Sequence, residues 1–315
     1  MILARTLRTL AAAAVAALLA HPAAAADCPG NPAALGTSRT LVVDPAAHPA
    51  VGSQQVAESL PLEDHEIVLT FDDGPIPKYS GQVLDILARE CVRAVFFEVG
   101  EMSRDHPDGI RRLIAEGHTV GTHTMHHPLD LNRAPAERIA KEIDGGIREA
   151  RAAADDAAAI APFFRPPGLV RGAALEAALR GRSLMEWDVD FSADDWHRIS
   201  ADRVAELAIA RIEERGRGIL LLHDIHQRTV DALPAILREL KARGYRIVEV
   251  VPATAERPAT PVDASLWTFR PAPKDPLPAQ AAGPKARMPA PAEMFRADAK
   301  PDRGPMPAID ETGSF

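Results

Sequence analysis

One segment constrains this chain more than any other, and from Ile67 to Pro75 it reads IVLTFDDGP. Its apolar part, Ile67–Phe71, predicts a buried strand. Two adjacent carboxylates, Asp72 and Asp73, follow at once and precede a Gly-Pro turn. Neighbouring side chains at a strand end point in different directions, so one carboxylate could bind a metal ion while the other stays free as a base. Taken alone, the segment would more simply be a polar cap between strand and loop.

A second cluster, with the sequence HTMHHP, begins at His123 and follows another apolar segment. His123 and His127 are four residues apart, and in a helical turn this spacing places two imidazoles on one face, where they can share a metal ion. We expect His126 to be a bystander. With a carboxylate from the first segment, the two histidines form a donor set that suits borderline metals such as zinc. Three protein ligands leave a position open for the water that hydrolysis requires.

Three further segments place polar residues directly after apolar runs, and they are Phe163–Gly168, Trp187–Trp196 and Ile219–Asp224. Each has an ordinary structural explanation: a surface salt bridge, a solvated acidic loop and a satisfied histidine at a strand end. Five such segments in one order are hard to explain by chance.

In this order the five segments resemble the motifs of the polysaccharide deacetylases, carbohydrate esterase family four. The matching stretches are Thr70–Gly74, His123–Pro128, Arg165–Gly168, Asp190–Trp196 and Leu221–His223. The resemblance spans residues 67–251 approximately. It implies a distorted (β/α)7 barrel and the metal-dependent removal of acetyl groups from N-acetylated, or sometimes O-acetylated, sugars.

The resemblance assigns Asp73, His123 and His127 as ligands of a divalent metal. Zn²⁺ is the ion we expect, with Co²⁺ or a similar ion as the alternative. The resemblance also makes Asp72 the base that takes the proton of the attacking water. Arg165 would keep Asp72 ionised and aligned, because a nearby cation lowers the pKa of a carboxylate.

By the same resemblance, His223 is the general acid toward the leaving nitrogen. A carboxylate beside it would favour the imidazolium form. The fourth segment carries one residue more than the family pattern, because Asp194 and Asp195 both precede Trp196. We assign the role to Asp195, and the choice between the two aspartates stays open here.

The resemblance implies that the backbone N–H of Gly168 stabilises the oxyanion, and that Leu221 and Trp196 wall the acetyl pocket. Many family members have Tyr where this chain has Gly168, so a ring contact to the sugar is lost. We expect Trp187 to belong to the core rather than to a sugar platform.

Strand-like runs alternate with helical patterns along the middle of the chain. The candidate strands are Ile67–Phe71, Ala94–Val99, Thr119–Thr122, Phe163–Arg165, Leu184–Val189, Ile219–His223 and Arg246–Val250. Repeated βα units predict a parallel sheet, and catalytic residues at the carboxyl ends of strands suit a barrel. We therefore expect an α/β fold, a distorted (β/α)7 barrel, as a single catalytic domain over residues 64–255.

The N-terminus predicts a signal peptide over residues 1–26. Arg5 and Arg8 give it a positive start, the apolar run Leu10–Ala20 is too short to span a bilayer, and Ala24–Ala26 offers a small-residue cleavage site. An uncleaved anchor is the alternative. We expect an exported protein, periplasmic or secreted, with no stable membrane span after cleavage.

Residues 27–63 form an irregular arm, within which Leu41–Val43 could be a short edge strand. The chain has 2 cysteines, Cys28 and Cys91. Export permits a disulfide that would join the arm to the domain, and two free thiols are the alternative. The formal charge of −8 and the lack of a basic stripe argue against nucleic-acid binding.

Proline recurs among alanine and mixed charge from about residue 256 to the end, which predicts a disordered tail over residues 256–315. Trp267 and Phe269 are the tail residues that could pack against the domain.

Two other functions compete with deacetylation of an acetylated glycan. A metal-independent amide or ureide hydrolase of the same fold would tend to lose the metal ligands, and here they are intact. A non-catalytic glycan-binding module would not need Asp72 and His223. The sequence leaves the glycan open among chitooligosaccharide, peptidoglycan and an exopolysaccharide.

Overall fold

The computed structural model describes residues 28–268. The predicted signal peptide lies outside this range, as does most of the predicted tail. Seven α-helices occur in the described range: α1 Pro77–Arg89, α2 Gly100–Asp105, α3 Pro107–Ala115, α4 Ala136–Ala153, α5 Ala173–Arg180, α6 Ala201–Arg215 and α7 Gln227–Ala242. Four 3₁₀ turns accompany them: η1 Leu131–Arg133, η2 Ala157–Ala159, η3 Pro167–Leu169 and η4 Ala264–Trp267.

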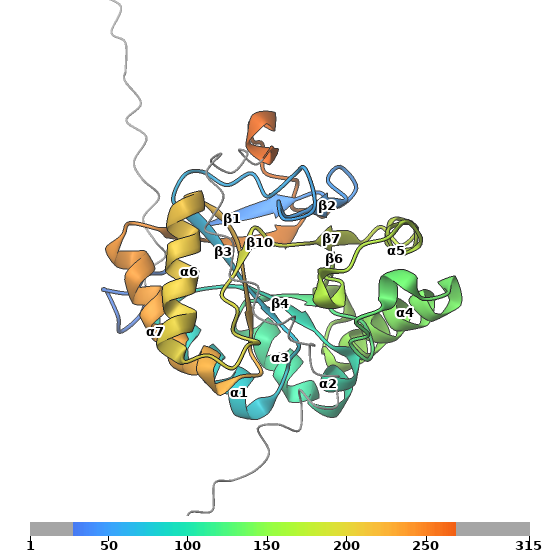
Figure 1. Cartoon of the computed structure of the whole chain (residues 1–315), viewed down its shortest axis with the longest axis horizontal. Helices are drawn as coiled ribbons and strands as arrows, with labels where there is room; N and C mark the ends of the chain where they lie inside the picture. Colours follow the sequence, from blue (N-terminus) through green and yellow to red (C-terminus); the bar gives the residue numbers. More distant parts are fainter. Residues whose placement is uncertain (1–27, 269–315) are drawn as a thin grey trace, which may run out of the picture.

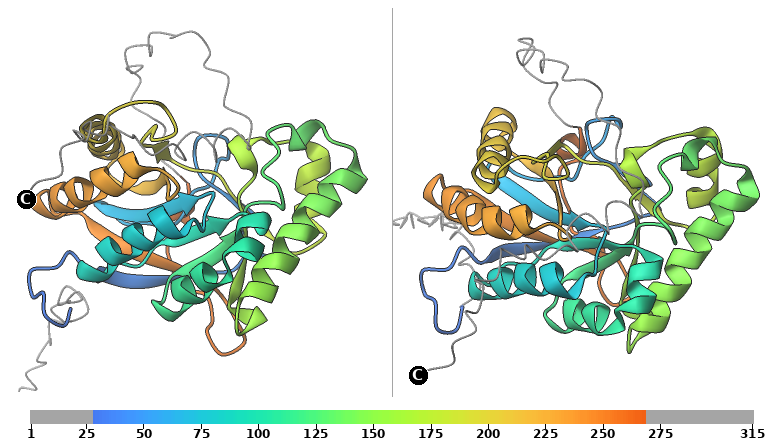
Figure 2. Two further views of the ribbon diagram at one scale, coloured as in Figure 1. Left: turned by 90° about the horizontal axis from the view of Figure 1, so that it is seen from below. Right: turned by 60° about the horizontal axis from the view of Figure 1, so that its bottom comes forward.

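The strands of the described range form one sheet: β1 Thr37–Val43, β2 Ala50–Val51, β3 Glu66–Asp72, β4 Val95–Glu98, β5 Thr119–Thr122, β6 Ile160–Phe164, β7 Met185–Trp187, β8 Phe191–Ser192, β9 Gly218–His223 and β10 Arg246–Pro252. Their order is β1-β10-β3-β4-β5-β6-β7-β2, with β9 on β3 and β8 on β9. These strand pairings are all parallel. Figures 1 and 2 show the helices around the outside of the strands, with α6 and α7 side by side. The predicted distorted (β/α)7 barrel is confirmed.

Side-chain alternation along the strands decides which residues face the barrel interior. All seven residues of β3 are buried, as expected for a parallel strand with both faces covered. On β3, Ile67, Leu69 and Phe71 pack in the cluster shared with the helices, whereas Val68 packs in a second cluster. This second cluster also contains residues from β6, β9 and β10, so it fills the barrel interior. Because the side-chain period is two, Asp72 lies on the same face of β3 as Val68.

The same alternation applies to β9 and to the end of β6. Ile219 and Leu221 pack in the interior cluster, whereas Leu220 and Leu222 pack toward the helices, so His223 has interior parity. Phe163 also packs inside, and Arg165 follows it by two residues. Three strands thus direct polar side chains into one end of the barrel.

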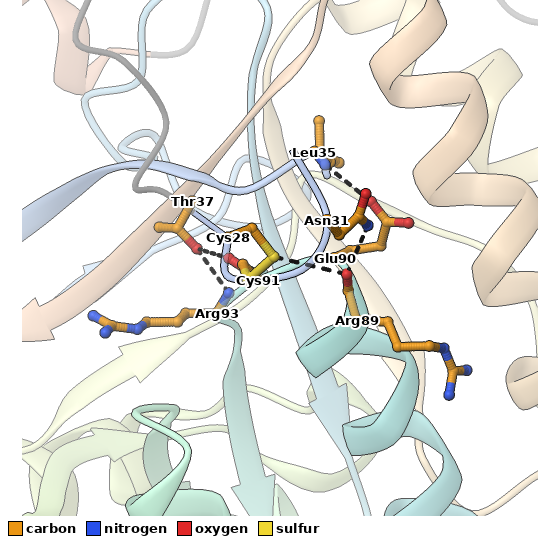
Figure 3. Close-up of a disulfide and its surroundings, with 8 residues drawn as sticks. All are labelled: Cys28, Asn31, Leu35, Thr37, Arg89, Glu90, Cys91 and Arg93. Atoms are coloured by element: carbon orange, nitrogen blue, oxygen red, sulfur yellow. Dashed lines mark hydrogen bonds between the residues drawn. A yellow bond between two sulfur atoms is a disulfide. The ribbon is translucent and has the colours of Figure 1, made fainter. Parts of the chain in front are cut away.

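The N-terminal arm is built into the sheet rather than laid on its surface. β1 runs parallel to β10 from Thr37 to Val43, and β2 pairs with β7. The strand expected at Leu41–Val43 is therefore longer than predicted. The cysteines form a disulfide, Cys28–Cys91, across a sequence separation of 63 residues. Figure 3 shows the bridge beside the end of α1, where Asn31 Nδ2 also donates to the Arg89 carbonyl at 2.9 Å.

The packed domain continues beyond the boundary predicted at residue 255. Trp267 is buried, and its ring stacks on His48 of the arm at 3.3 Å between centroids. Ser59 N–H donates to the Trp267 carbonyl at 2.8 Å. The prediction of a disordered tail is therefore corrected over residues 256–268, because Trp267 packs against His48 of the N-terminal arm. Phe269 lies outside the described residues.

Within residues 28–268, no helix combines the length and apolar character needed to cross a bilayer.

Candidate active site

Three donor side chains converge at the carboxyl ends of β3 and β5. The ligand atoms of Asp73, His123 and His127 all lie within 4.8 Å of one another, and all three side chains are buried. Asp73 Oδ1 is 3.1 Å from His127 Nε2 and 3.4 Å from His123 Nε2. Within residues 28–268, neither carboxylate oxygen of Asp73 has a hydrogen-bond partner of good geometry. Buried polar atoms are normally satisfied, so these unused lone pairs fit a bound cation.

The tautomer of His123 and the ionised state of Asp73 also fit a metal site. His123 Nδ1 lies 2.6 Å from the Arg165 carbonyl, which can only accept, so Nδ1 carries the proton and Nε2 presents a lone pair. Burial alone would raise the pKa of Asp73, but the neighbouring His127 and His123 hold it well below its ordinary value. A charged carboxylate with two imidazoles is a donor set that suits Zn²⁺.

The two histidines converge through a loop, so the expected helical turn is wrong. Residues 123–128 contain no helix. Thr124 and His127 adopt left-handed backbone angles, with φ of 69° and 54°, and Thr124 Oγ1 accepts a hydrogen bond from His127 N–H at 2.9 Å. His126 instead points toward Glu142, 3.1 Å from Nδ1 to Oε1, with its side chain 58% exposed. It lies away from the metal donors, as expected of a bystander.

Asp72 is held by a fully buried cation. Arg165 Nη1 donates to Asp72 Oδ1 at 2.7 Å and to Thr70 Oγ1 at 2.8 Å. The guanidinium also lies over the ring of Phe97, with Cζ 4.2 Å from the ring centroid. Asp72 Oδ2 is then 3.7 Å from His123 Nε2. Arg165 thus fixes Asp72 beside the metal donors without occupying Oδ2.

His223 and Asp195 form a second buried charge pair. Asp195 Oδ1 is 2.7 Å from His223 Nδ1, and Asp195 Oδ2 accepts from His223 N–H and from Thr229 Oγ1. Burial alone would lower the pKa of His223, but the Asp195 charge raises it to about 9. Asp194 points elsewhere, with Oδ2 2.7 Å from Arg211 Nη2. The geometry therefore favours Asp195 over Asp194 as the partner of His223.

These groups surround one cavity of about 120 Å³. Eight of its lining residues come from the five sequence segments, and Leu169 directly follows the third; together they are Asp72, Asp73, His123, His127, Gly168, Leu169, Trp196, Leu221 and His223. Arg165 and Asp195 are fully buried behind it. The Trp196 ring meets His223 edge-on at 5.5 Å between centroids. Trp187 is fully buried with Phe97 and Phe163, which confirms its expected place in the core.

Known proteins with similar sequences carry the same domain. The sequence profile of the family described as polysaccharide deacetylase matches residues 60–181. A chitooligosaccharide deacetylase of Rhizobium leguminosarum bv. trifolii is 36% identical over 205 residues, which cover 59% of this chain and 90% of that protein. The chain belongs to the polysaccharide deacetylase family. Members of this family are hydrolases that act on carbon–nitrogen bonds.

Other polysaccharide deacetylases extend the comparison to peptidoglycan. A peptidoglycan-N-acetylglucosamine deacetylase of Listeria monocytogenes is 33% identical, over 58% of this chain and 38% of that protein. A solved peptidoglycan deacetylase of Bdellovibrio bacteriovorus aligns with a TM-score of 0.60 at 29% identity, over 69% of this chain and 60% of that chain. A pseudoenzyme of the family from Bacillus anthracis shares the fold, with a TM-score of 0.55 at 19% identity, over 63% of this chain and 73% of that chain.

This polysaccharide deacetylase domain also contains two buried acids, Glu98 and Asp224, which are not among the predicted site residues. None of the four carboxylate oxygens of Glu98 and Asp224 has a hydrogen-bond partner within the described residues. A Cβ on Gly74 would lie 2.6 Å from Asp224 Oδ2 and 2.9 Å from Glu98 Oε2, so both acids face this glycine. Burial and nearby acids raise the pKa of Asp224 to about 7 and that of Glu98 well above its ordinary value. In the sequence, Glu98 follows the apolar residues Val95–Phe97, and Asp224 follows His223 at the end of the fifth segment.

Proposed function

We propose that this protein is an exported, metal-dependent deacetylase that removes N-acetyl groups from N-acetylglucosamine units of an oligosaccharide or polysaccharide, such as chitooligosaccharide or peptidoglycan. One observation carries the proposal. A single small cavity brings together an Asp-His-His donor set, a second carboxylate that is hydrogen-bonded by Arg165, and a histidine that is paired with Asp195.

A divalent ion held by Asp73, His123 and His127 would polarise the acetyl carbonyl and lower the pKa of a water molecule. Zn²⁺ is the ion we propose for this nitrogen and oxygen donor set. Asp72 would take the proton of the attacking water, because its Oδ2 faces the donor set while Arg165 occupies Oδ1.

The remaining groups act on the carbonyl oxygen and on the leaving nitrogen. The Gly168 N–H would donate to the developing oxyanion. Gly168 has a φ of 63°, a conformation that favours glycine. His223 would protonate the leaving amine from Nε2, because Asp195 holds Nδ1. Leu221 and Trp196 would enclose the acetyl methyl group.

The two competing functions fit these observations less well. A metal-independent hydrolase has no use for a buried carboxylate that is kept ionised beside two imidazoles. A non-catalytic glycan-binding module of the same fold would not need both charge pairs, Asp72 with Arg165 and Asp195 with His223. O-acetylated sugars remain a second substrate class, because the ester carbonyl needs the same groups.

Two features support export. The first is the predicted signal peptide. The second is the Cys28–Cys91 disulfide, since such bonds persist mainly in oxidising compartments.

Release of acetate tests the proposal. The purified protein should release acetate from N-acetylated chitooligosaccharides or from peptidoglycan. Chelation should abolish the release, and Zn²⁺ should restore it. Circular dichroism of the chelated protein checks that the fold persists. No release from either N-acetylated substrate by the metal-loaded protein would refute the proposed reaction, and release only from O-acetylated sugars would reassign the substrate class.

A further inference from the structure

The N-terminal arm enters the barrel wall beside the fourth motif. Asp188 N–H donates to the Val51 carbonyl at 2.7 Å, and Gln54 N–H donates to the Val189 carbonyl at 3.0 Å. Gly52 has a φ of 112°, and a Cβ there would lie 2.4 Å from the Asp188 carbonyl carbon. The two backbones therefore touch, and the arm forms part of the wall that carries the site.

A motif residue with no role in the proposed chemistry fixes this contact. Asp190 is 1% exposed. Its Oδ1 accepts from Ser53 N–H at 2.8 Å, and its Oδ2 accepts from Ser59 Oγ at 2.7 Å and from Ile219 N–H at 2.8 Å. Asp190 thus anchors both ends of the arm turn 53–59 to the start of β9.

From this anchored turn, Gln55 reaches the pocket wall. Its Nε2 donates to the Leu169 carbonyl at 2.6 Å, and its own carbonyl accepts from Arg171 Nη1 at 3.1 Å. These two hydrogen bonds join residues more than one hundred positions apart in the sequence, and they connect the arm turn to Leu169 and Arg171.

The segment held by Gln55 is strained and lines the cavity. Gly168 and Leu169 both adopt left-handed backbone angles, with φ of 63° and 55°, and both line the cavity. A left-handed leucine is unfavourable because its Cβ crowds the backbone, and such strain persists only when surrounding contacts enforce it. Gln55 supplies one of these contacts.

We propose that Gln55 is a positioning residue, whose amide holds the Gly168–Leu169 turn against the cavity and so sets how closely the wall fits the acyl group. The inference rests on the proposed deacetylase function. Its consequence is selectivity for acetyl over longer acyl groups. One extra methylene against a close wall costs about 10- to 200-fold in kcat/KM, and a loosened wall would surrender part of that discrimination.

The test compares three variants in the metal-loaded protein. Gln55→Ala removes the donor, and Gln55→Glu keeps the shape but places an oxygen against the Leu169 carbonyl. Gln54→Ala is the matched control, because this neighbouring glutamine is exposed like Gln55. The first readout is kcat/KM for N-acetyl and N-propionyl chitooligosaccharides. The second is hydrogen–deuterium exchange of the segment 166–172, which does not depend on activity.

Both Gln55 variants should lower kcat/KM for the acetyl substrate about threefold to tenfold, the range expected for one hydrogen bond. They should also lower the acetyl-to-propionyl ratio and speed exchange at 168–170, while Gln54→Ala resembles the parent. A normal ratio with normal exchange in both variants overturns the inference, and so does a Gln55→Glu protein that behaves as the parent. If the parent protein releases no acyl group, the proposed function fails. The positioning role of Gln55 is tested separately by hydrogen–deuterium exchange, and unchanged exchange in both Gln55 variants refutes it.

Discussion

Replacing Asp195 by Asn should make the activity loss depend on pH. In the proposed mechanism, His223 acts as an acid and must be protonated before each turnover. Burial lowers the pKa of His223, and the Asp195 carboxylate more than offsets this, so the pKa is about 9. Asn keeps the volume of Asp but removes the charge. Asn also has one acceptor oxygen where Asp has two. Its NH2 group would therefore face either His223 Nδ1 or the donors His223 N–H and Thr229 Oγ1, and a hydrogen bond that Asp195 accepts on that side would be lost as well.

The size of the effect follows from the two pKa values. At pH 8, an imidazole with a pKa of about 9 is about 90% protonated, whereas one with the ordinary pKa of about 6.5 is about 3% protonated. Loss of the acid form alone therefore lowers kcat/KM about 30-fold at pH 8 and only about fourfold at pH 7. Burial without the neighbouring charge would push the pKa lower still, so these values are minima.

The assay is the pH profile of kcat/KM for acetate release between pH 6 and 10, with metal content measured for each variant. The alkaline limb should move to lower pH in Asp195→Asn. Asp194→Asn is the matched control, because Asp194 pairs with Arg211 and not with His223, so its alkaline limb should stay in place. A limb that moves in Asp194→Asn and stays in Asp195→Asn would refute the assignment of the acid pair.

Three further changes test other parts of the structure. His127→Ala should lose bound zinc by elemental analysis while His126→Ala keeps it, and the reverse result would show that the ligand set is wrong. The double change Cys28→Ser with Cys91→Ser should lower the free energy of unfolding, measured in urea, by up to about 4 kcal/mol, because the disulfide closes a long loop in the unfolded chain. A loss under about 1 kcal/mol would mean that the unfolded chain is already constrained without the disulfide. Glu98→Gln should raise Tm by about 2–4 °C or more at pH 8 and very little at pH 5. The reason is that the pKa of Glu98 is raised on folding, so the folded protein loses stability as the pH rises through that pKa, and Gln removes this loss. An equal gain in Tm at both pH values would exclude a titrating group.

The parts of the site that the sequence could predict are those set by strand alternation and motif order. A side chain two residues beyond an interior position faces the interior again, which places Asp72, Arg165 and His223 together once the strands are known. The choice between Asp194 and Asp195 could not be made in this way. It depends on how the extra residue is accommodated, and the chain does so with a left-handed Asp194, whose φ is 56°.

Other features escaped prediction because their partners are distant or their backbone is unusual. The spacing of His123 and His127 suggested a helical turn, but Thr124 and His127 take left-handed backbone angles, which are uncommon for residues other than glycine. Trp267 lies in a proline-rich stretch, and its burial depends on contacts with distant residues, among them the stack on His48 of the arm. Gln55 belongs to no motif, so its contacts with Leu169 and Arg171 could not be predicted from the sequence.

The charges beneath the cavity favour a bound cation at this site. Asp72 is neutralised by Arg165, and Asp195 is neutralised by His223. Asp73 has the two imidazoles of the donor set beside it and no cation paired to it as Arg165 is to Asp72, among the residues described. Glu98 and Asp224 lie near it, and their raised pKa values reflect the crowding of acids there. An ionised carboxylate is costly to bury without a compensating charge, yet the neighbouring histidines hold the pKa of Asp73 low. A divalent ion at Asp73 would supply the missing charge and also discourage protonation of the two imidazoles. In the proposed mechanism, Asp73 and the two histidines hold the cation, and the two outer charge pairs are left free to transfer protons.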